Sequence, residues 1–282
     1  MIYLASRRAL SANGQTFTAK PGNTTSFLRT AIPNQSHTPA QRIDPRVWAQ
    51  EALNQGNNGH VLLVIHGFRI PQHSFLKEVS KVRKKLGSRF RGAVVGLDWP
   101  TNGRLFDYRK DLQDAKKTAG PLFRDAVEAL HLARPSVKLH ILAHSMGCLF
   151  TSVALQSALG SSLETKLRGS LRTIAVTGAD VDQDWTTPSH PFSQALGRTC
   201  RRFIVHHSAH DEVLHVSEDR FHGGRKRLGR DGPAASRPAV LLDVPWTDYY
   251  RQNLWRPFAP RRSHNFYYDE APFYATLAPS LQ

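Results

Sequence analysis

The sequence has little cysteine and no long apolar run, and each shortage excludes a class of protein. Only Cys148 and Cys200 occur among the 282 residues, so no disulfide framework is implied and the cytoplasm is the expected location. The longest purely aliphatic run, Val61 to Ile65, is far shorter than the roughly 20 apolar residues of a membrane-spanning helix. Residues 1–10 lack the apolar core of a secretory signal peptide, and none is expected.

Acidic residues are also scarce relative to basic ones. The chain has 38 lysines and arginines against 22 aspartates and glutamates, which gives a formal net charge of +16. Such a charge favours attraction to nucleic acid, to an anionic membrane surface or to an acidic substrate. The basic residues are scattered and no aromatic residues are interleaved with them in a motif, so we expect no dedicated nucleic-acid site. A loose affinity for polyanions is the remaining expectation.

Apolar runs of strand length alternate with amphipathic helical patterns after residue 60. This alternation predicts an α/β fold with a mostly parallel central sheet and helices on both faces. Gly120-Pro121 is a candidate break in the long helical stretch from Leu105 to Leu132. The predicted strands are residues 61–65, 93–97, 137–143, 171–177, 202–207 and 240–244.

The first 58 residues have a different character. A short apolar start at residues 2–5, followed by Gln15-Thr-Phe-Thr18, predicts one or two edge strands. Residues 19–45, rich in Pro, Asn, Thr and Ser, predict an irregular surface stretch. Asp44-Pro45 predicts the start of a short helix over residues 46–54. We expect residues 1–58 to pack on the larger α/β region of residues 59–282, the two forming a single domain.

One stretch joins a predicted strand to a predicted helix through a serine. The apolar run ends at Ala143, and a helical pattern begins just after Ser145. Such a sharp corner requires a strained backbone at the serine and small residues two positions before and after it, as Ala143 and Gly147 are. The corner lifts the hydroxyl out of the sheet and aims a helix N-terminus at the group under attack. The pattern therefore predicts Ser145 as a nucleophile.

A serine nucleophile needs a base to take its proton and an acid to orient that base. The chain order expected on this architecture is serine, acid, histidine. His264 is the best candidate base because it follows the last predicted strand, in a loop. Asp211, which follows the predicted strand 202–207, ranks first as the acid, and Asp182 and then Asp180 are the alternatives.

The oxyanion of an acyl-transfer intermediate needs two backbone donors. We expect the amide of Met146, at the helix start, and the amide of Phe68, in the loop after the first predicted parallel strand. Gly67 allows the backbone to approach closely there, and His66 is expected to be a hydrogen-bonded structural residue. Weaker candidates for lining a substrate pocket are Trp99, Trp185, Leu214, Phe68 and Phe192.

Together these residues resemble the α/β-hydrolase superfamily over roughly residues 60–270. Ala143 stands where the commoner serine corner has glycine, and its small side chain fits the same space. Several stretches resemble a little-characterised bacterial branch of that fold, in which Asp211 aligns with the usual acid. These stretches are Asp98-Trp-Pro, Tyr108-x-x-Asp111, Ala179-Asp-Val-Asp182, Ser208-Ala-His-Asp211 and His222-Gly-Gly224.

The resemblance implies a serine hydrolase that cleaves small carboxylic esters, as carboxylesterases and lipases do, through a Ser-His-Asp triad and without a cofactor. An acyltransferase or thioesterase of the same fold, and a non-catalytic polyanion-binding protein, are the alternatives. Many relatives carry a cap domain after the predicted strand 171–177. Only residues 178–201 lie there in this chain, so no large cap is expected. The longer insertion, residues 99–121, is a candidate wall of the site.

A metal hydrolase is a competing interpretation. His206 and His210 are four residues apart, with Asp211 and His215 nearby, and this spacing can bind zinc when it lies on one helix. His206 ends a predicted strand, which breaks the helical spacing, so no metal site is predicted.

Overall fold

The computed structural model describes residues 1–31, 38, 41–101, 107–257 and 259–282. In this part of the chain eight strands form one sheet in the order β2-β1-β4-β3-β5-β6-β7-β8. All neighbouring strands are parallel except β1 and β2, which confirms the predicted fold class. The strands are β1 (Ile2–Leu10), β2 (Phe17–Thr30), β3 (His60–Ile65), β4 (Ala93–Asp98), β5 (Lys138–His144), β6 (Leu171–Thr177), β7 (Arg202–His207) and β8 (Leu241–Pro245).

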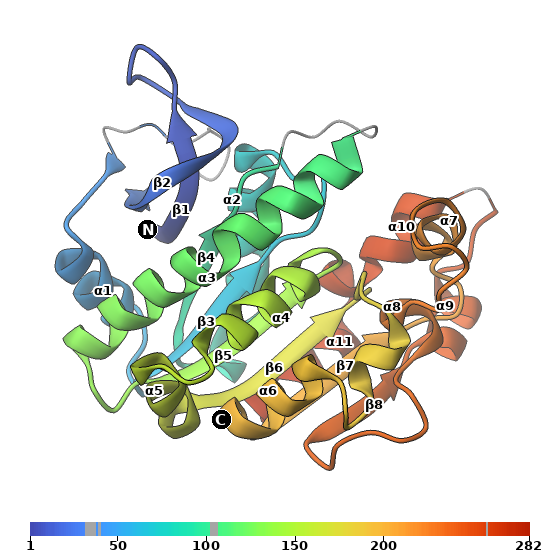
Figure 1. The fold of residues 1–282 in the computed structure, drawn as a ribbon. Coiled ribbons are helices and arrows are strands. Elements are labelled where there is room, and N and C mark those ends of the chain that lie inside the picture. Colours follow the sequence, from blue (N-terminus) through green and yellow to red (C-terminus); the bar gives the residue numbers. More distant parts are fainter. Residues whose placement is uncertain (32–37, 39–40, 102–106, 258) are drawn as a thin grey trace.

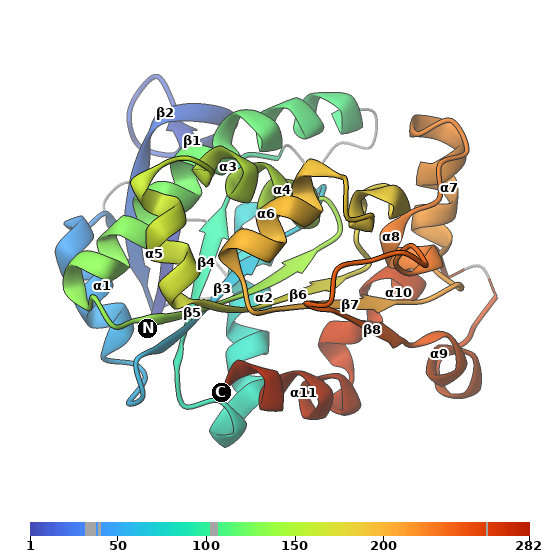
Figure 2. The ribbon, with the colours of Figure 1, turned by 60° about the horizontal axis from the view of Figure 1, so that its bottom comes forward.

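Helices cover both faces of this sheet, as Figures 1 and 2 show. Apolar side chains of α1, α3, α4, α5 and α6 form one core against the sheet, and those of α2, α9 and α11 form a second core on the opposite face. The central strands are apolar along their length because both of their faces are buried. The helices are α1 (Pro45–Leu53), α2 (Gln72–Leu86), α3 (Tyr108–Ala133), α4 (Gly147–Ala158), α5 (Ser162–Ser170), α6 (Pro191–Thr199), α7 (Glu212–Phe221), α8 (Leu228–Asp231), α9 (Thr247–Asn253), α10 (Pro260–Asn265) and α11 (Ala271–Leu277).

The six predicted apolar strands coincide with β3 to β8 to within one residue at each end. The predicted short helix is α1, where the Asp44 side chain accepts hydrogen bonds from the amides of Arg46 and Val47. Between β6 and β7 the chain forms a 3₁₀ turn and the nine-residue α6, so no large cap is present at residues 178–201. No helix among the described residues is both long and apolar enough to cross a membrane.

The predicted irregular stretch over residues 19–45 is wrong for its first part, because β2 continues to Thr30. β2 is the outermost strand, so Pro21 can occupy it without removing a hydrogen bond that a further strand would need. The pairing of β1 with β2 shifts register on both sides of Arg8, and Arg8 lies opposite Pro21. Residues 32–37 and 39–40 of the predicted stretch lie outside the described residues.

The predicted break at Gly120-Pro121 is also wrong. α3 runs from Tyr108 to Ala133 with Pro121 inside it, whereas the predicted start at Leu105 lies outside the described residues. A proline inside a helix costs about 3 kcal/mol, but burial of one face of α3, including Leu122 and Phe123, offsets this cost. A Cβ atom on Gly120 would lie 2.8 Å from Oγ of Ser157 in α4, so glycine allows the two helices to pack closely.

Candidate active site

Ser145 lies at the corner between β5, which ends at His144, and α4, which begins at Gly147. Its φ of 54° is in the left-handed region, which costs a non-glycine residue about 1–3 kcal/mol. A Cβ atom on Gly147 would come within 2.7 Å of the carbonyl oxygens of Ile65 and His66, so a larger residue does not fit there. The backbone therefore has the strained, tightly packed corner that the sequence predicts.

His264 and Asp211 meet beyond the carboxyl ends of the strands. Nδ1 of His264 lies 2.7 Å from Oδ2 of Asp211, and both side chains are buried. Burial by itself lowers the pKa of His264, but the Asp211 carboxylate and its hydrogen bond outweigh this and raise the pKa above its ordinary value. Because Nδ1 donates to Asp211, Nε2 of His264 is left to accept a proton.

His264 lies on α10 rather than in a loop, which corrects the sequence prediction. The aromatic residues that follow it are buried, as expected, and pack in the core formed by α2, α9 and α11. His144, which the sequence prediction overlooked, lies beneath His264, with 4.6 Å between the ring centroids. Burial and the neighbouring His264 lower the pKa of His144 to about 3, so it is neutral at pH 7 and donates from Nε2 to the His264 carbonyl, 3.2 Å away.

Gly178, directly after β6, is a second residue that the sequence prediction overlooked. A Cβ atom there would lie 3.1 Å from Nδ1 of His264 and 3.3 Å from Oδ2 of Asp211. Its φ of 51° also favours glycine. Gly178 therefore provides the space in which the histidine and the carboxylate meet.

A cavity of about 390 Å³ opens at Ser145 and His264. Its wall is mostly apolar, and much of it comes from α7 and from the loop after β3. Such a pocket suits a substrate with an apolar part and one reactive polar group. The lining side chains include Phe68, Ile70, Tyr108, Val213, Val216 and Phe221.

Trp99, Trp185 and Leu214 do not line this cavity, contrary to the prediction that they do. Trp99 is fully buried and stacks on the His66 ring, with 5.0 Å between the ring centroids. Leu214, in α7, has no exposed surface. Trp185 stacks on His190 at 5.1 Å, and Phe192 packs on Phe203 in the core. The sequence identifies these side chains as apolar but does not separate core positions from pocket positions. Phe68 is the one of the five that lines the cavity.

The loop after β3 lies directly against the serine corner. A Cβ atom on Gly67 would be 2.8 Å from Cβ of Ser145, so this loop approaches the serine as closely as glycine allows. Phe68 follows Gly67 and lines the cavity. The amide of Met146 precedes the first turn of α4, where helix N–H groups have no partner within the helix. The two amides predicted to bind an oxyanion thus belong to two different elements, the loop after β3 and the start of α4.

Comparison with known proteins agrees with this architecture. The family described as alpha/beta hydrolase of unknown function (DUF900) matches residues 42–241, which is most of the chain. The protein belongs to this family. An uncharacterized protein of Nostoc sp. is 23% identical over an alignment of 128 residues that covers 37% of this chain and 33% of the relative. The chain therefore spans about a third of the length of the curated relative that it matches.

Two solved structures that resemble this α/β hydrolase are distant from it in sequence. A cutinase-like protein from Cryptococcus sp. is 13% identical with a TM-score of 0.40, over 82% of this chain and 98% of that one. A predicted CIB-like hydrolase from Thermoplasma acidophilum is 11% identical with a TM-score of 0.39, over 79% and 88% of the two chains. Similarities this low carry no argument about the reaction.

Asp180 and Asp182, the alternative acids, belong to a buried network around Arg227 in this α/β hydrolase, and Asp180 also lines the cavity. Arg227, which is almost fully buried, forms ion pairs with both carboxylates. The Tyr108 hydroxyl donates to Asp180 over 2.7 Å and lies 2.7 Å from Nε2 of His222. Burial by itself raises the pKa of Asp180, but Arg227, His222 and the hydrogen bonds it accepts hold that pKa below its ordinary value. These carboxylates are occupied by partners other than His264.

A second buried network supports the loop after β3 in this α/β hydrolase. Nε of Arg8, in β1, lies 3.0 Å from both oxygens of Asp98 at the end of β4. Nε2 of His66 lies 3.3 Å from the same carboxylate, and the indole of Trp99 donates to the His66 carbonyl. Asp98 thus connects the first strand of the protein with the loop that contains Phe68.

The histidines of the metal interpretation do not lie on one helix, because His206 is in β7, His210 lies between β7 and α7, and His215 is in α7. His206 is buried in β7, where its Nδ1 accepts a hydrogen bond from the indole of Trp246, and burial with the nearby His207 lowers its pKa to about 3. The Asp211 carboxylate pairs with His264 instead. Across the described residues, no group of three or more His, Cys, Asp or Glu side chains has the arrangement of a metal site.

Proposed function

We propose that the protein is a serine hydrolase that cleaves carboxylic esters through an acyl-enzyme on Ser145. The observation that carries the proposal is the buried 2.7 Å hydrogen bond between His264 and Asp211 at the edge of a cavity that Ser145 also lines. A left-handed serine at a strand–helix corner is the second support. The family match supports the fold, and the ester substrate rests on the site alone.

In the proposed reaction, Oγ of Ser145 attacks the ester carbonyl while Nε2 of His264 takes the serine proton. Asp211 holds the ring in the tautomer with hydrogen on Nδ1 and stabilises the imidazolium that forms. The amides of Phe68 and Met146 bind the oxyanion. His264 then gives its proton to the leaving alcohol, and a water activated by the same base hydrolyses the acyl-enzyme.

The lining of the cavity supports a preference for an apolar ester. Its wall carries apolar side chains from Phe68, Ile70, Val213, Val216 and Phe221, and its volume of about 390 Å³ suits a medium-sized group. We therefore infer that the acyl or alcohol part beside Ser145 is apolar. A series of p-nitrophenyl esters from acetate to decanoate measures this preference directly.

The test combines labelling with substitution. A fluorophosphonate probe is expected to label the wild-type protein on Ser145 and to leave Ser145→Ala unlabelled. Ser145→Ala and His264→Ala are each expected to lower kcat for p-nitrophenyl butyrate by up to about 10⁶-fold, and Asp211→Asn by about 10⁴-fold. The non-catalytic alternative is the correct one if the folded wild-type protein neither reacts with the probe nor hydrolyses any ester of the series.

The structure offers a matched control for the acid. Nε2 of His207 lies 2.8 Å from Oδ1 of Asp243, a second His–Asp pair that does not line the cavity. Asp243→Asn is therefore expected to leave kcat/KM within about twofold. If Asp211→Asn stays fully active while Asp182→Asn is inactive and folded, the acid has been assigned to the wrong carboxylate.

A further inference from the structure

A second cavity lies at the amino ends of the central strands, whereas the candidate active site lies beyond their carboxyl ends. It has a volume of about 380 Å³, and four cations line it: Lys138, Arg172, Arg201 and Arg202. His60, Thr173, Ser280 and Gln282 complete the wall, and no aspartate or glutamate side chain lines it. The proposed catalytic residues follow the carboxyl ends of the same strands, about 20 Å away at about 3.3 Å per residue.

The sheet itself brings these cations together. Lys138 is the first residue of β5 and lies in register with His60, the first residue of β3. Arg202 begins β7 and lies in register with Thr173, which directly follows Arg172 in β6. Neighbouring strands are about 4.8 Å apart. Backbone pairing therefore sets the positions of Lys138, Arg172 and Arg202 in the sheet, and Arg201 directly precedes β7.

These cations have no anionic partner among the described residues. Within that part of the chain, none of the four side chains forms an ion pair or a side-chain hydrogen bond. Partial burial and the charges of Arg172 and Arg201 lower the pKa of Lys138, and partial burial and Arg201 lower the pKa of Arg172. The folded protein thus holds like charges close together, and a bound anion would relieve their repulsion.

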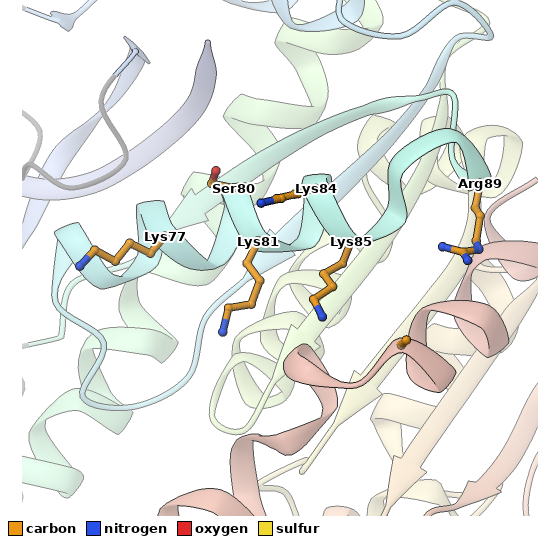
Figure 3. A pocket seen from close by; sticks show the side chains of 7 residues that line it. Lys77, Ser80, Lys81, Lys84, Lys85 and Arg89 are labelled. Atoms are coloured by element: carbon orange, nitrogen blue, oxygen red, sulfur yellow. The ribbon is translucent and has the colours of Figure 1, made fainter.

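The lysine row on α2 is a useful contrast. Figure 3 shows Lys77, Lys81, Lys84 and Lys85 along one helix that borders another hollow. Lys81 is paired with the Asp269 carboxylate at 2.6 Å, and Lys85 donates to the Asp269 carbonyl. The charge of this row is thus partly neutralised, and its side chains all come from the exposed face of one helix. The cavity at the strand ends instead collects three guanidinium groups from two neighbouring strands and the residue before one of them.

We propose that the cavity at the amino ends of β5, β6 and β7 binds a chain of phosphate groups, as an inorganic oligophosphate or as the phosphate tail of a nucleotide. Guanidinium groups present planar pairs of N–H donors that match phosphate oxygens, and Lys138 adds a point charge. Four positive charges suit a ligand with several negative charges better than one orthophosphate. The site is independent of the proposed esterase reaction.

The first experiment is a calorimetric titration of the full chain with sodium tripolyphosphate, ATP without magnesium, and orthophosphate, each at 150 mM NaCl. Tripolyphosphate is expected to bind one site per chain at least about tenfold more tightly than orthophosphate. Equal affinities for ATP and tripolyphosphate would mean that only the phosphates are recognised, and tighter binding of ATP would identify a nucleotide tail as the ligand. If neither tripolyphosphate nor ATP binds saturably to one site per chain, the proposal is overturned.

Substitutions separate the site from the overall charge of +16. Arg172→Gln/Arg201→Gln is expected to weaken tripolyphosphate binding by at least about tenfold, a change of about 1.4 kcal/mol. Lys77→Gln/Lys84→Gln on α2 removes the same charge and is expected to leave binding within about twofold. Equal weakening by the two pairs would mean that net charge alone attracts the anion, which would refute the site. Thermal unfolding of both variants checks that each is folded.

Discussion

Gly178→Ala tests whether the hydrogen-bonded pair of His264 and Asp211 is needed for the proposed hydrolysis. The new methyl carbon would lie 3.1 Å from Cε1 and Nδ1 of His264 and 3.3 Å from Oδ2 of Asp211. Contacts this short force the neighbours to move by a few tenths of an ångström. The 2.7 Å hydrogen bond between the two side chains then lengthens or bends.

The size of the effect follows from that displacement. A misplacement of about 1 Å costs on the order of 100-fold in rate, so a few tenths predicts a loss of about three- to tenfold in kcat/KM. A weaker bond to Asp211 also lowers the pKa of His264, because that carboxylate is what raises it. The acid limb of the pH–rate profile is therefore expected to move to lower pH in the variant.

Gly160→Ala is the matched control. Gly160 has a φ of 75°, so alanine there carries a similar left-handed strain of about 1–2 kcal/mol. A Cβ atom on Gly160 meets nothing within 4 Å. Both variants should lose similar stability in urea, and only Gly178→Ala should lose activity. Equal activities of the two variants on p-nitrophenyl butyrate would refute the proposed role of the pair.

Other outcomes follow from the same contacts. The kcat/KM of the wild-type protein should be half-maximal above pH 6.5, because His264 must be neutral to accept a proton and its pKa is raised; a rate unchanged down to pH 5.5 would contradict this. Arg227→Met leaves the buried Asp180 without its cation and should lower the free energy of unfolding in urea by about 3–5 kcal/mol. Val216→Trp narrows the cavity and should reduce kcat/KM for the octanoate ester about tenfold more than for acetate. Deletion of residues 1–30 should abolish cooperative thermal unfolding, since we propose that residues 1–58 and 59–282 fold as one unit and β1 pairs with β4.

Local signals explain which parts of the fold the sequence predicts. Strands β3 to β8 are short apolar runs between polar breaks, and the serine corner is defined by residues 143–147 alone. β2 is an exposed edge strand that contains Pro21 and has a weak apolar pattern, so composition indicates a loop. The continuity of α3 through Pro121 depends on packing against distant segments, which no local pattern records.

The candidate site likewise has parts that a local sequence signal predicts and parts that depend on distant residues. Ser145 is recognisable from its neighbours in the sequence, but the partner of each polar side chain lies far away along the chain. Tyr108 and Asp180 are 72 residues apart, and His264 and Asp211 are 53 apart. Chain order admits Asp180, Asp182 and Asp211 alike, and the resemblance to a branch of the fold favoured Asp211. Only the three-dimensional structure reveals that Arg227 pairs with Asp180 and Asp182. The need for glycine at position 178 likewise becomes visible only when the structure shows where His264 and Asp211 lie.

The position of β1 has a consequence during synthesis. β1 and β2 leave the ribosome before β4, which is the second neighbour of β1, and Arg8 is 90 residues before Asp98. At about 5–20 residues per second, the free edge of β1 waits about 5–20 s for its partner. An unpaired edge invites association with other chains, and charged residues discourage it. Arg7 and Arg8 can therefore protect the nascent hairpin before Arg8 becomes buried against Asp98.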